Sequence, residues 1–301
     1  MTPSTPPTTT GSPQQPGFDP AWLAAREPAD HVARAGGLVD VLRGALRPAG
    51  GDGAALVVRD LGSGTGSLAR WLAPRLAGPQ HWVLYDRDPR LLALATDATA
   101  ALTDAGGAPV RVCTAATDLT ALRAPDLAGA AAITASALLD LLTAGEVDAL
   151  AAACAAAGCA VLWTLSVTGE VALDPVDPLD GPLAAAFDAH QRRPGAGGRL
   201  LGPDAPDAAA AALRRHGMTV RVADSPWQLG PDRPELLAAW LRGRVEAAVE
   251  HEPALAAGAD RWLADRLAQA SAGRLRAVVG HRDLLALPNN PTELDHPEVA
   301  R

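Results

Sequence analysis

Three glycines at alternate positions follow a short apolar run, and this pattern constrains the fold more than any other feature of the chain. Residues 55–68 read Ala-Leu-Val-Val-Arg-Asp-Leu-Gly-Ser-Gly-Thr-Gly-Ser-Leu, so that Gly62, Gly64 and Gly66 stand directly after a predicted strand. An apolar segment with helix-forming residues begins at once behind them. A strand, a glycine turn and a helix in this order are typical of the first unit of a Rossmann-like α/β domain. Glycine is favoured there because it adopts positive φ and lets a ligand approach bare backbone.

Strands and helices alternate along most of the chain, which predicts an α/β fold with a doubly wound, mostly parallel sheet of seven strands. The helix after the second strand has a strong start signal, because Asp88 can cap it and Pro89 occupies its first position. Two helices are expected between Pro20 and Leu46, with Asp30 capping the second. The expected strands are 55–61, 81–86, 109–113, 130–135, 159–167, 218–223 and 274–279.

Two helical insertions interrupt this alternation, at about residues 168–202 and 231–272. The first is rich in Pro, Asp and Gly and is longer than an ordinary connection in α/β units. The second contains two amphipathic helices. We expect both insertions to lie over the carboxyl edge of the sheet, where ligands bind in such folds. The domain is expected to span residues 21–287, between a disordered tail (1–20) and a loose tail (288–301).

Charge and composition exclude several classes of function. The formal net charge of −8 argues against a nucleic-acid partner, since nucleic-acid-binding proteins present a basic stripe. No apolar run is long and clean enough to span a membrane, and no secretory signal is visible. Three cysteines without metal-ligand spacing fit a reducing, cytoplasmic location. Asp174, Asp177 and Asp180 are separated by prolines and are interpreted as a rigid solvated loop, so no metal is expected.

The spacing of the glycines separates two classes of nucleotide-binding fold. Nicotinamide and flavin sites use G-x-G-x-x-G, which would require glycine at the position of Ser67. The segment Asp60-Leu61-Gly62-Ser63-Gly64-Thr65-Gly66 instead resembles motif I (D/E-x-G-x-G-x-G) of class I S-adenosylmethionine-dependent methyltransferases. The whole chain is also similar to methyltransferases of an actinobacterial type. The resemblance covers roughly residues 48–223 and the last strand, and it implies the strand order 3-2-1-4-5-7-6 with the seventh strand antiparallel. The insertion before the last strand leaves the position of that strand open.

The resemblance implies that S-adenosyl-L-methionine is the cofactor and assigns it residues along the sheet edge. Asp86, at the end of the second strand, would accept hydrogen bonds from the ribose hydroxyls, and its alternative role as a helix cap is already filled by Asp88. Asp118 would bind the adenine, or would be a plain turn aspartate. Asp60 would organise the glycine loop and the methionine ammonium group. The expected cofactor-binding residues are Asp60, Gly62, Ser63, Gly64, Gly66, Asp86, Arg87, Asp118, Leu119 and Ser136.

Candidates for binding and activating the methyl acceptor lie mostly in the additions to this core. His190 is the expected general base, and the alternative is a solvent-facing histidine at a helix C-terminus. Trp163 and Trp227 are expected to wall an apolar acceptor pocket, unless they are core residues. Arg34 is expected to meet the cofactor carboxylate or to form a surface salt bridge. His281, just beyond the last predicted strand, belongs to no pattern that assigns it a role.

These features predict a methyltransferase that acts on a small molecule, on oxygen more readily than on nitrogen or carbon. The chain lacks the N/D-P-P-Y/F tetrapeptide that marks methylation of exocyclic or amide nitrogens in resembling enzymes. An NAD(P)-dependent oxidoreductase is the first alternative, but Ser67, a single tyrosine and the absence of lysine oppose it. A non-catalytic binding protein on the same fold is the second. The sequence does not determine the oligomeric state.

Overall fold

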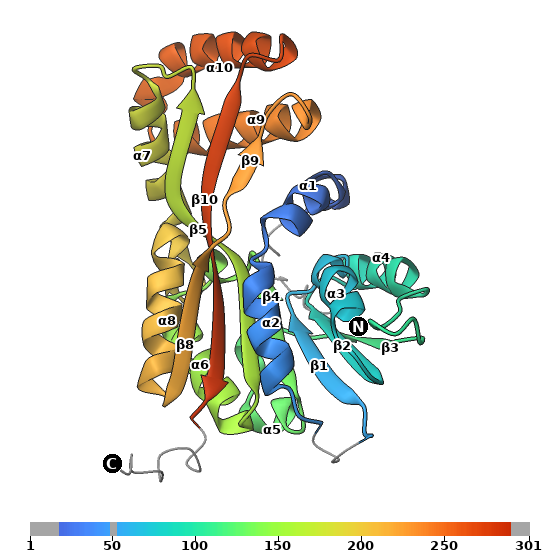
Figure 1. The fold of residues 1–301 in the computed structure, drawn as a ribbon. Helices are drawn as coiled ribbons and strands as arrows, with labels where there is room; N and C mark the ends of the chain where they lie inside the picture. The colour runs from blue at the N-terminus through green and yellow to red at the C-terminus, as the bar shows by residue number, and fades with distance from the viewer. Residues whose placement is uncertain (1–17, 49–52, 290–301) are drawn as a thin grey trace, which may run out of the picture.

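The computed structural model describes residues 18–48 and 53–289 of the 301-residue chain. The tails expected at 1–20 and 288–301 therefore fall outside the described residues, apart from the positions that join them to the domain. A mixed sheet with the strand order β3-β2-β1-β4-β5-β10-β8 forms the lower part of the molecule in Figure 1, and β9 joins it by pairing with β10. This arrangement confirms the predicted doubly wound α/β fold, with one strand more than expected.

The sheet combines a parallel half with an antiparallel edge. The parallel strands are β1 (Leu56–Leu61), β2 (Gln80–Asp86), β3 (Arg111–Ala116), β4 (Ala132–Ser136) and β5 (Ala160–Asp174). The last strand, β10 (Arg276–Pro288), lies between β5 and β8 (Met218–Asp224) and is antiparallel to both. The insertion before it therefore does not displace it from the place that the resemblance implies. A separate hairpin is formed by β6 (Pro194–Gly195) and β7 (Gly198–Arg199).

Helices cover both faces of the sheet, because successive side chains of a strand point to opposite faces. In β4, Ile133 packs in one apolar core and Ala132 in the other. The first core is covered by α5 (Ala124–Leu127), α6 (Ala144–Ala157) and α8 (Ala205–Arg215). The second is covered by α2 (Gly36–Ala45), α3 (Ser67–Leu72) and α4 (Pro89–Thr99). Short 3₁₀ turns occur at η1 (Ala73–Arg75), η2 (Leu119–Ala121), η3 (Leu139–Leu141), η4 (Gly202–Asp204) and η5 (Pro253–Leu255).

β5 and β10 continue beyond the sheet and carry an upper part of the molecule (Figure 1). The predicted ends of these strands, at Val167 and at residues 274–279, are therefore wrong. The polar run 168–170 hides the continuation in the sequence, because it breaks the apolar pattern and forms a bulge opposite Gly280. Three helices pack with β9 (Trp227–Leu229) around a third apolar core, namely α7 (Asp180–Gln191), α9 (Pro234–His251) and α10 (Ala256–Ser271).

The N-terminal helix α1 (Pro20–Ala33) is continuous through Asp30, so the prediction that Asp30 caps a second helix is wrong. Asp30 is buried, and its carboxylate instead accepts hydrogen bonds from Arg26 Nε (3.0 Å) and Trp227 Nε1 (2.9 Å). These bonds hold α1 against β9 of the upper part. The local sequence misleads here because an Asp in the last turn of one helix looks the same as an Asp that caps the next helix.

A buried carboxylate fixes the turn between α1 and α2. Asp283, in the middle of β10, accepts a hydrogen bond from Ala35 N at 2.8 Å. It also accepts one from Leu165 N (2.8 Å) and one from Ser225 Oγ (2.6 Å). One side chain thus joins the N-terminal helices, the bulged part of β5 and the turn after β8.

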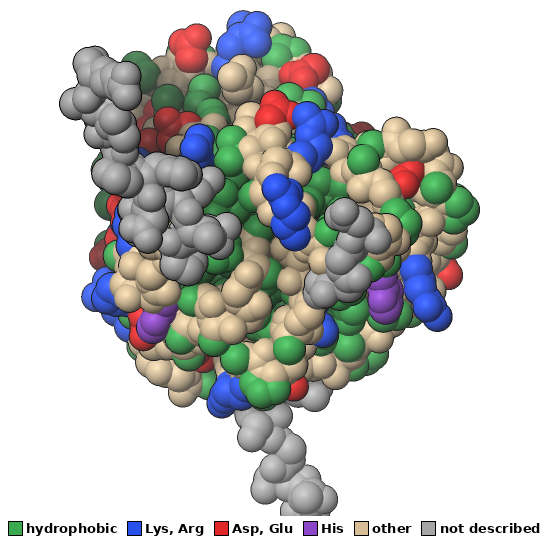
Figure 2. All heavy atoms as spheres, turned by 60° about the horizontal axis from the view of Figure 1, so that its bottom comes forward, with side chains coloured by type: hydrophobic (Ala, Val, Ile, Leu, Met, Phe, Trp, Pro, Cys, Tyr) green, Lys and Arg blue, Asp and Glu red, His purple; other side chains and the backbone are tan. Residues whose placement is uncertain are grey.

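Over residues 18–48 and 53–289, none of the helices combines the length and the apolar character that crossing a bilayer requires. Within the same ranges, no group of three or more His, Cys, Asp or Glu side chains is arranged to hold a metal ion. On the face brought forward in Figure 2, acidic and basic side chains are interspersed with apolar ones.

Candidate active site

The glycine turn connects β1 to α3 at the carboxyl edge of the sheet. Gly62, Gly64 and Gly66 have φ values of +62°, +54° and +80°, a region that residues with side chains rarely adopt. A Cβ atom at Gly62 would stand only 2.9 Å from Leu138 Cδ1, and one at Gly66 would stand 3.1 Å from Thr99 Cγ2. The alternating glycines therefore follow both from the backbone conformation and from close packing.

Asp86 lies at the end of β2, beside this turn. Its Oδ2 accepts a hydrogen bond from Gly64 N and its Oδ1 accepts one from Asp88 N, both at 2.9 Å. Asp88 in turn accepts from Arg90 N at 2.9 Å, which confirms that Asp88 caps α4. Asp86 is half-buried, and a carboxylate has about four acceptor positions, so both of its oxygens keep capacity for a ligand. The next residue, Arg87, is exposed.

Asp118 follows the neighbouring strand β3. Its Oδ1 accepts hydrogen bonds from Thr120 N (3.0 Å) and Thr120 Oγ1 (2.8 Å), and these bonds lower the pKa of the carboxyl group. Asp118 is exposed and Leu119 is half-buried. Because β2 and β3 are adjacent, Asp86 and Asp118 stand at neighbouring strand ends, the former nearer the glycine turn. Ser63, inside the turn, has a buried Oγ without a hydrogen-bond partner among the described residues.

Asp60 is a buried carboxylate directly beneath the glycine turn. It is 1% exposed, and its Oδ1 accepts a hydrogen bond from Thr134 Oγ1 at 2.7 Å. Its Oδ2 has no partner within the part of the chain that the structure describes. Burial raises the pKa of Asp60 to about 7, against the opposing effects of Thr134 and the positive charge of Arg34.

Arg34 is a buried cation at the end of α1. It is 4% exposed, and its Nη2 donates to Ser136 Oγ (3.1 Å) and more weakly to Ser67 Oγ (3.4 Å). Its Nε and Nη1 are buried without a hydrogen-bond partner in the described ranges. Burial lowers the pKa of Arg34 to about 10, which leaves the guanidinium charged at neutral pH. The side chain is therefore not the surface salt bridge that was considered as its alternative role.

Together these two side chains form an incomplete pair of charges where β1, β4 and α3 meet. Thr134 and Ser136, which contact Asp60 and Arg34 respectively, are two residues apart on β4. An ammonium group would complete the hydrogen bonding of Asp60, and a carboxylate would complete that of Arg34. The α-amino-acid end of S-adenosylmethionine carries both groups, so the residues present fit it.

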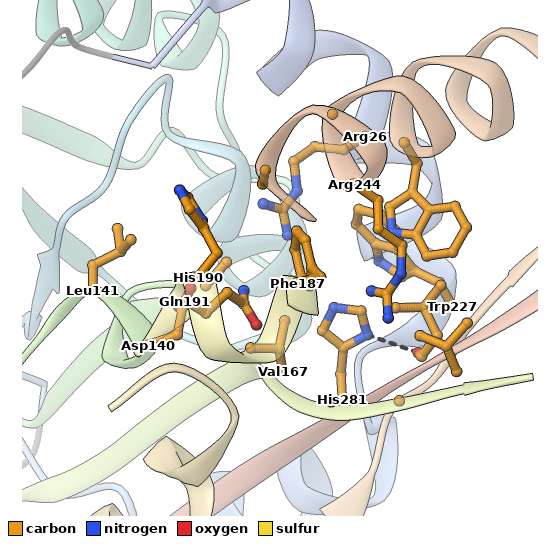
Figure 3. A pocket seen from close by; sticks show the side chains of 18 of the residues that line it. Arg26, Asp140, Leu141, Val167, Phe187, His190, Gln191, Trp227, Arg244 and His281 are labelled. Atoms are coloured by element: carbon orange, nitrogen blue, oxygen red, sulfur yellow. Dashed lines mark hydrogen bonds between the residues drawn. The ribbon is translucent and has the colours of Figure 1, made fainter. Parts of the chain in front are cut away.

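A cavity of about 410 Å³ lies at the same edge, between the upper part and α1 (Figure 3). Its volume is in the range of small-molecule sites. The rings of Trp22, Phe187, Trp227 and Trp240 give it aromatic walls. Of the two tryptophans expected to line an acceptor pocket, Trp227 does so, from β9. Trp163 is fully buried in the core beneath α6 and α8, and the structure corrects that expectation to a packing role.

His281 lines this cavity and was not singled out from the sequence. It is 3% exposed, its Nδ1 lies 2.9 Å from Val279 O, and its ring centroid lies 5.1 Å from that of Trp227. Burial lowers its pKa to about 4, so the ring is neutral at pH 7. An Nδ1–H that donates to the carbonyl leaves Nε2 as an acceptor. The available signal was the alternation of buried residues Ala277, Val279, His281 and Asp283, which continues past the predicted strand end.

A second histidine and an aspartate also line the cavity. His190, near the end of α7, has its Nε2 3.3 Å from Glu250 Oε2, and burial is the main cause that lowers its pKa. Asp140, on η3 four residues after Ser136, was also missed from the sequence. Burial raises the pKa of Asp140 to about 6. Asp140 lies in the connection after β4, which contains no recognisable motif, so its place at the cavity is visible only in the folded structure.

Comparisons with known proteins give structural likenesses only. No protein-family model matches the sequence, and no curated protein matches it. One similar solved structure is an S-adenosylmethionine-dependent methyltransferase from Geobacter sulfurreducens in complex with S-adenosyl-L-homocysteine (18% identity over 90% of this chain and 99% of that chain, TM-score 0.44). Another is a methyltransferase from Thiobacillus denitrificans with the same ligand (15% identity, 90% and 99%, TM-score 0.44). A third is the cyclopropane synthase MmaA2 from Mycobacterium tuberculosis (11% identity, 82% of each chain, TM-score 0.45). Likeness at this level identifies no reaction, which has to be inferred from the residues of this chain.

Proposed function

We propose that the protein is an S-adenosyl-L-methionine-dependent methyltransferase that acts on a small molecule. The observation that carries this proposal is the incomplete pair of buried charges, Asp60 and Arg34, beside a glycine turn at the carboxyl edge of the sheet. The unpartnered atoms of these residues match the ammonium and carboxylate groups of a bound methionine moiety. The motif that contains Asp60 resembles that of the methyltransferase family, which supports the same conclusion.

The other proposed cofactor contacts are made by residues at or just after the carboxyl ends of the strands. Asp86 would accept the ribose hydroxyls, and Asp118 with the backbone of Leu119 would bind the adenine. Gly62 and Gly64 would allow close approach of the ligand to the backbone, and Ser136 would line the methyl region together with Arg34. Ser63, Gly66 and Arg87 are proposed as flanking contacts. When bound, the cofactor supplies a methyl group activated by a neighbouring sulfonium charge.

The chain itself contributes alignment, exclusion of water and proton transfer. The aromatic walls of the cavity hold the acceptor in a low-water environment, and fixing its orientation supplies much of the catalysis. Methylation of a hydroxyl also requires a proton acceptor. We propose Asp140 for this role, because a pKa of about 6 keeps it ionised and basic near neutral pH. His281 would orient the acceptor through Nε2, and His190 is the weaker candidate because Glu250 already faces its Nε2.

The presence of proton acceptors in the cavity favours O-methylation over N- or C-methylation. We also propose a cytoplasmic location, in which the free cysteines Cys113, Cys154 and Cys159 stay reduced. A small-molecule acceptor, rather than a nucleic acid, fits the cavity volume of about 410 Å³ and the acidic chain.

Calorimetric titration of the full chain with S-adenosylmethionine, S-adenosylhomocysteine and NADH tests the proposed cofactor. We expect both adenosyl ligands to bind and NADH to give no response. Binding of NADH without a response to either adenosyl ligand would support an oxidoreductase and refute the proposal. Transfer of a labelled methyl group to a component of a small-molecule cell extract then separates an enzyme from a non-catalytic binding protein.

Replacing Asp86 with alanine should weaken binding of S-adenosylhomocysteine by about 1–3 kcal/mol, because charge-assisted hydrogen bonds to the ribose and to Gly64 N are lost. Asp88→Ala is the matched control. It removes a carboxylate two residues away that caps α4, so it should lower the melting temperature and leave the affinity nearly unchanged. Equal losses of affinity in the two variants, measured by calorimetry, would place the ribose elsewhere.

A further inference from the structure

Arg244, on α9, is a buried cation in the wall of the cavity. It is 6% exposed, and its Nη2 has no hydrogen-bond partner among the described residues. Its guanidinium carbon lies 4.5 Å from the ring centroid of Phe187 and 5.4 Å from that of Trp240. Two aromatic rings thus hold the guanidinium in place, but they do not neutralise its charge. A buried cation without an anionic partner is unfavourable, and a ligand that supplies an anion relieves this cost.

Two aspartates attract Arg244, but neither forms a salt bridge with it. Asp180 accepts a hydrogen bond from Arg266 Nη2 at 2.7 Å and another from Trp262 Nε1 at 2.8 Å. Asp188 attracts Arg244 at longer range; its Oδ2 faces Gly169 of β5, and its buried Oδ1 has no hydrogen-bond partner among the described residues. Neither aspartate forms an ion pair with Arg244. The guanidinium therefore has spare donors toward the cavity.

The other charges of the cavity do not satisfy Arg244. Arg26 is paired with Asp30, while Arg193 and Glu170 are exposed. Figure 3 shows Asp140 and Leu141 at one side of the cavity, and Arg244 and Trp227 at the other. Asp140 follows β4 and so marks the side of the proposed methyl donor, whereas Arg244 marks the far side.

We propose that the methyl acceptor is an aromatic carboxylic acid whose carboxylate pairs with Arg244. Its ring would lie among Phe187, Trp227 and Trp240, and its nucleophilic group would point toward Asp140. The planar guanidinium matches a carboxylate through two parallel hydrogen bonds, and ring–ring contacts favour a flat ligand body. That the bound acid is the methyl acceptor rests on the proposed methyltransferase function, whereas the binding of an aromatic acid does not.

The test compares aromatic acids with their neutral amides in the absence of any adenosyl compound. The probes are benzoic acid with benzamide, cinnamic acid with cinnamamide, and indole-3-acetic acid with its amide, titrated into the full chain by calorimetry. We expect at least one acid to bind about tenfold or more tightly than its amide, because only the acid forms the charged pair. Equal affinities in every pair, or no binding of any acid at millimolar concentration, overturn the proposal.

Variants of α9 test whether Arg244 causes the preference for acids over amides. Arg244→Met should reduce the acid-to-amide ratio to about one while it keeps the affinity for the amide, because the apolar walls remain. Arg242→Met, which removes the same charge from an exposed position on the same helix, should leave the ratio unchanged. An equal effect of both variants would indicate that the acid responds to the overall positive charge of α9, and it would overturn the pairing of the carboxylate with Arg244. If Arg244→Met does not fold, the wild-type comparison still decides.

The outcomes are separable from those of the cofactor titration. A preference for acids without adenosyl-ligand binding would refute the methyltransferase and keep the aromatic-acid site. Adenosyl-ligand binding without that preference would keep the methyltransferase and refute the acceptor class.

Discussion

Replacing Arg34 with methionine should weaken S-adenosylmethionine binding at least about 30-fold, because truncating one partner of a buried charge pair costs about 2–5 kcal/mol. Arg34 supplies two buried nitrogens that have no partner among the described residues, and in the proposed complex they would bind the methionine carboxylate. Methionine retains much of the volume of arginine, so the packing against Trp71 is largely kept. Calorimetry measures the affinity directly.

The control for this prediction is Arg43→Met. Arg43 is exposed on α2, where its only ion-pair partner among the described residues is Asp40. This variant loses the same formal charge, and its affinity should equal that of the wild type. Arg34→Met also removes a positive charge that attracts Asp60 and Asp283, so its melting temperature is measured alongside to show that the variant remains folded. Unchanged affinity in Arg34→Met would mean that the carboxylate of the ligand binds elsewhere.

Replacing Asp60 with asparagine should stabilise the ligand-free protein and weaken S-adenosylmethionine binding. Burial raises the pKa of Asp60 to about 7 in the folded chain, whereas the unfolded group titrates near 3.8. Between these values the folded state binds more protons, so the free energy of unfolding decreases as pH rises from about 4 to 7. Each unit of pKa shift corresponds to about 1.4 kcal/mol, which gives a gain of a few kcal/mol for the asparagine variant at pH 8. Chemical denaturation at pH 4 and pH 8 measures the difference.

Titration of Asp60 should also change the affinity of the wild type for S-adenosylmethionine, which should rise with pH while the stability falls. Only ionised Asp60 attracts an ammonium group, so the affinity for S-adenosylmethionine should decrease about tenfold per pH unit below pH 7 and level off above it. Asp60→Asn should remove most of this dependence and bind weakly throughout. Asp97→Asn, at an exposed position on α4, should match the wild type in both stability and affinity. A wild-type affinity that is flat from pH 5 to pH 8 would show that Asp60 does not meet the ammonium.

The parallel half of the sheet could be predicted because each of its signals is local. The apolar run before Gly62, the cap at Asp88 and the glycines themselves each depend on a few neighbouring residues. The course of β10 could not be predicted in the same way. Its hydrogen bonds are made with β5, far away in the sequence, where residues 168–170 bulge opposite Gly280 and interrupt the apolar pattern of β5.

The same distinction separates the two halves of the candidate site. The cofactor side depends on residues that follow strand ends, such as Asp60 and Asp86, so motif and spacing indicate it. The acceptor side brings together Asp140, Arg244 and His281 from three distant elements, and no motif or spacing assigns any of them a role. Long-range packing alone decides which of the chain's many arginines and histidines face the cavity.

The pairing of β9 with β10 also bears on how the specificity of such a protein can change. The chain leaves the sheet at Leu229 and returns to it at Ala277, and these two residues are directly opposite each other in the ladder. The pairing of these two strands therefore offsets part of the entropic penalty of closing the intervening loop, while its two helices pack in the third apolar core. Those helices contribute Trp240 and Arg244 to the cavity, but none of the glycine turn. Changes in this segment can therefore alter which ligand the cavity accepts, while the glycine turn and the proposed cofactor site stay as they are.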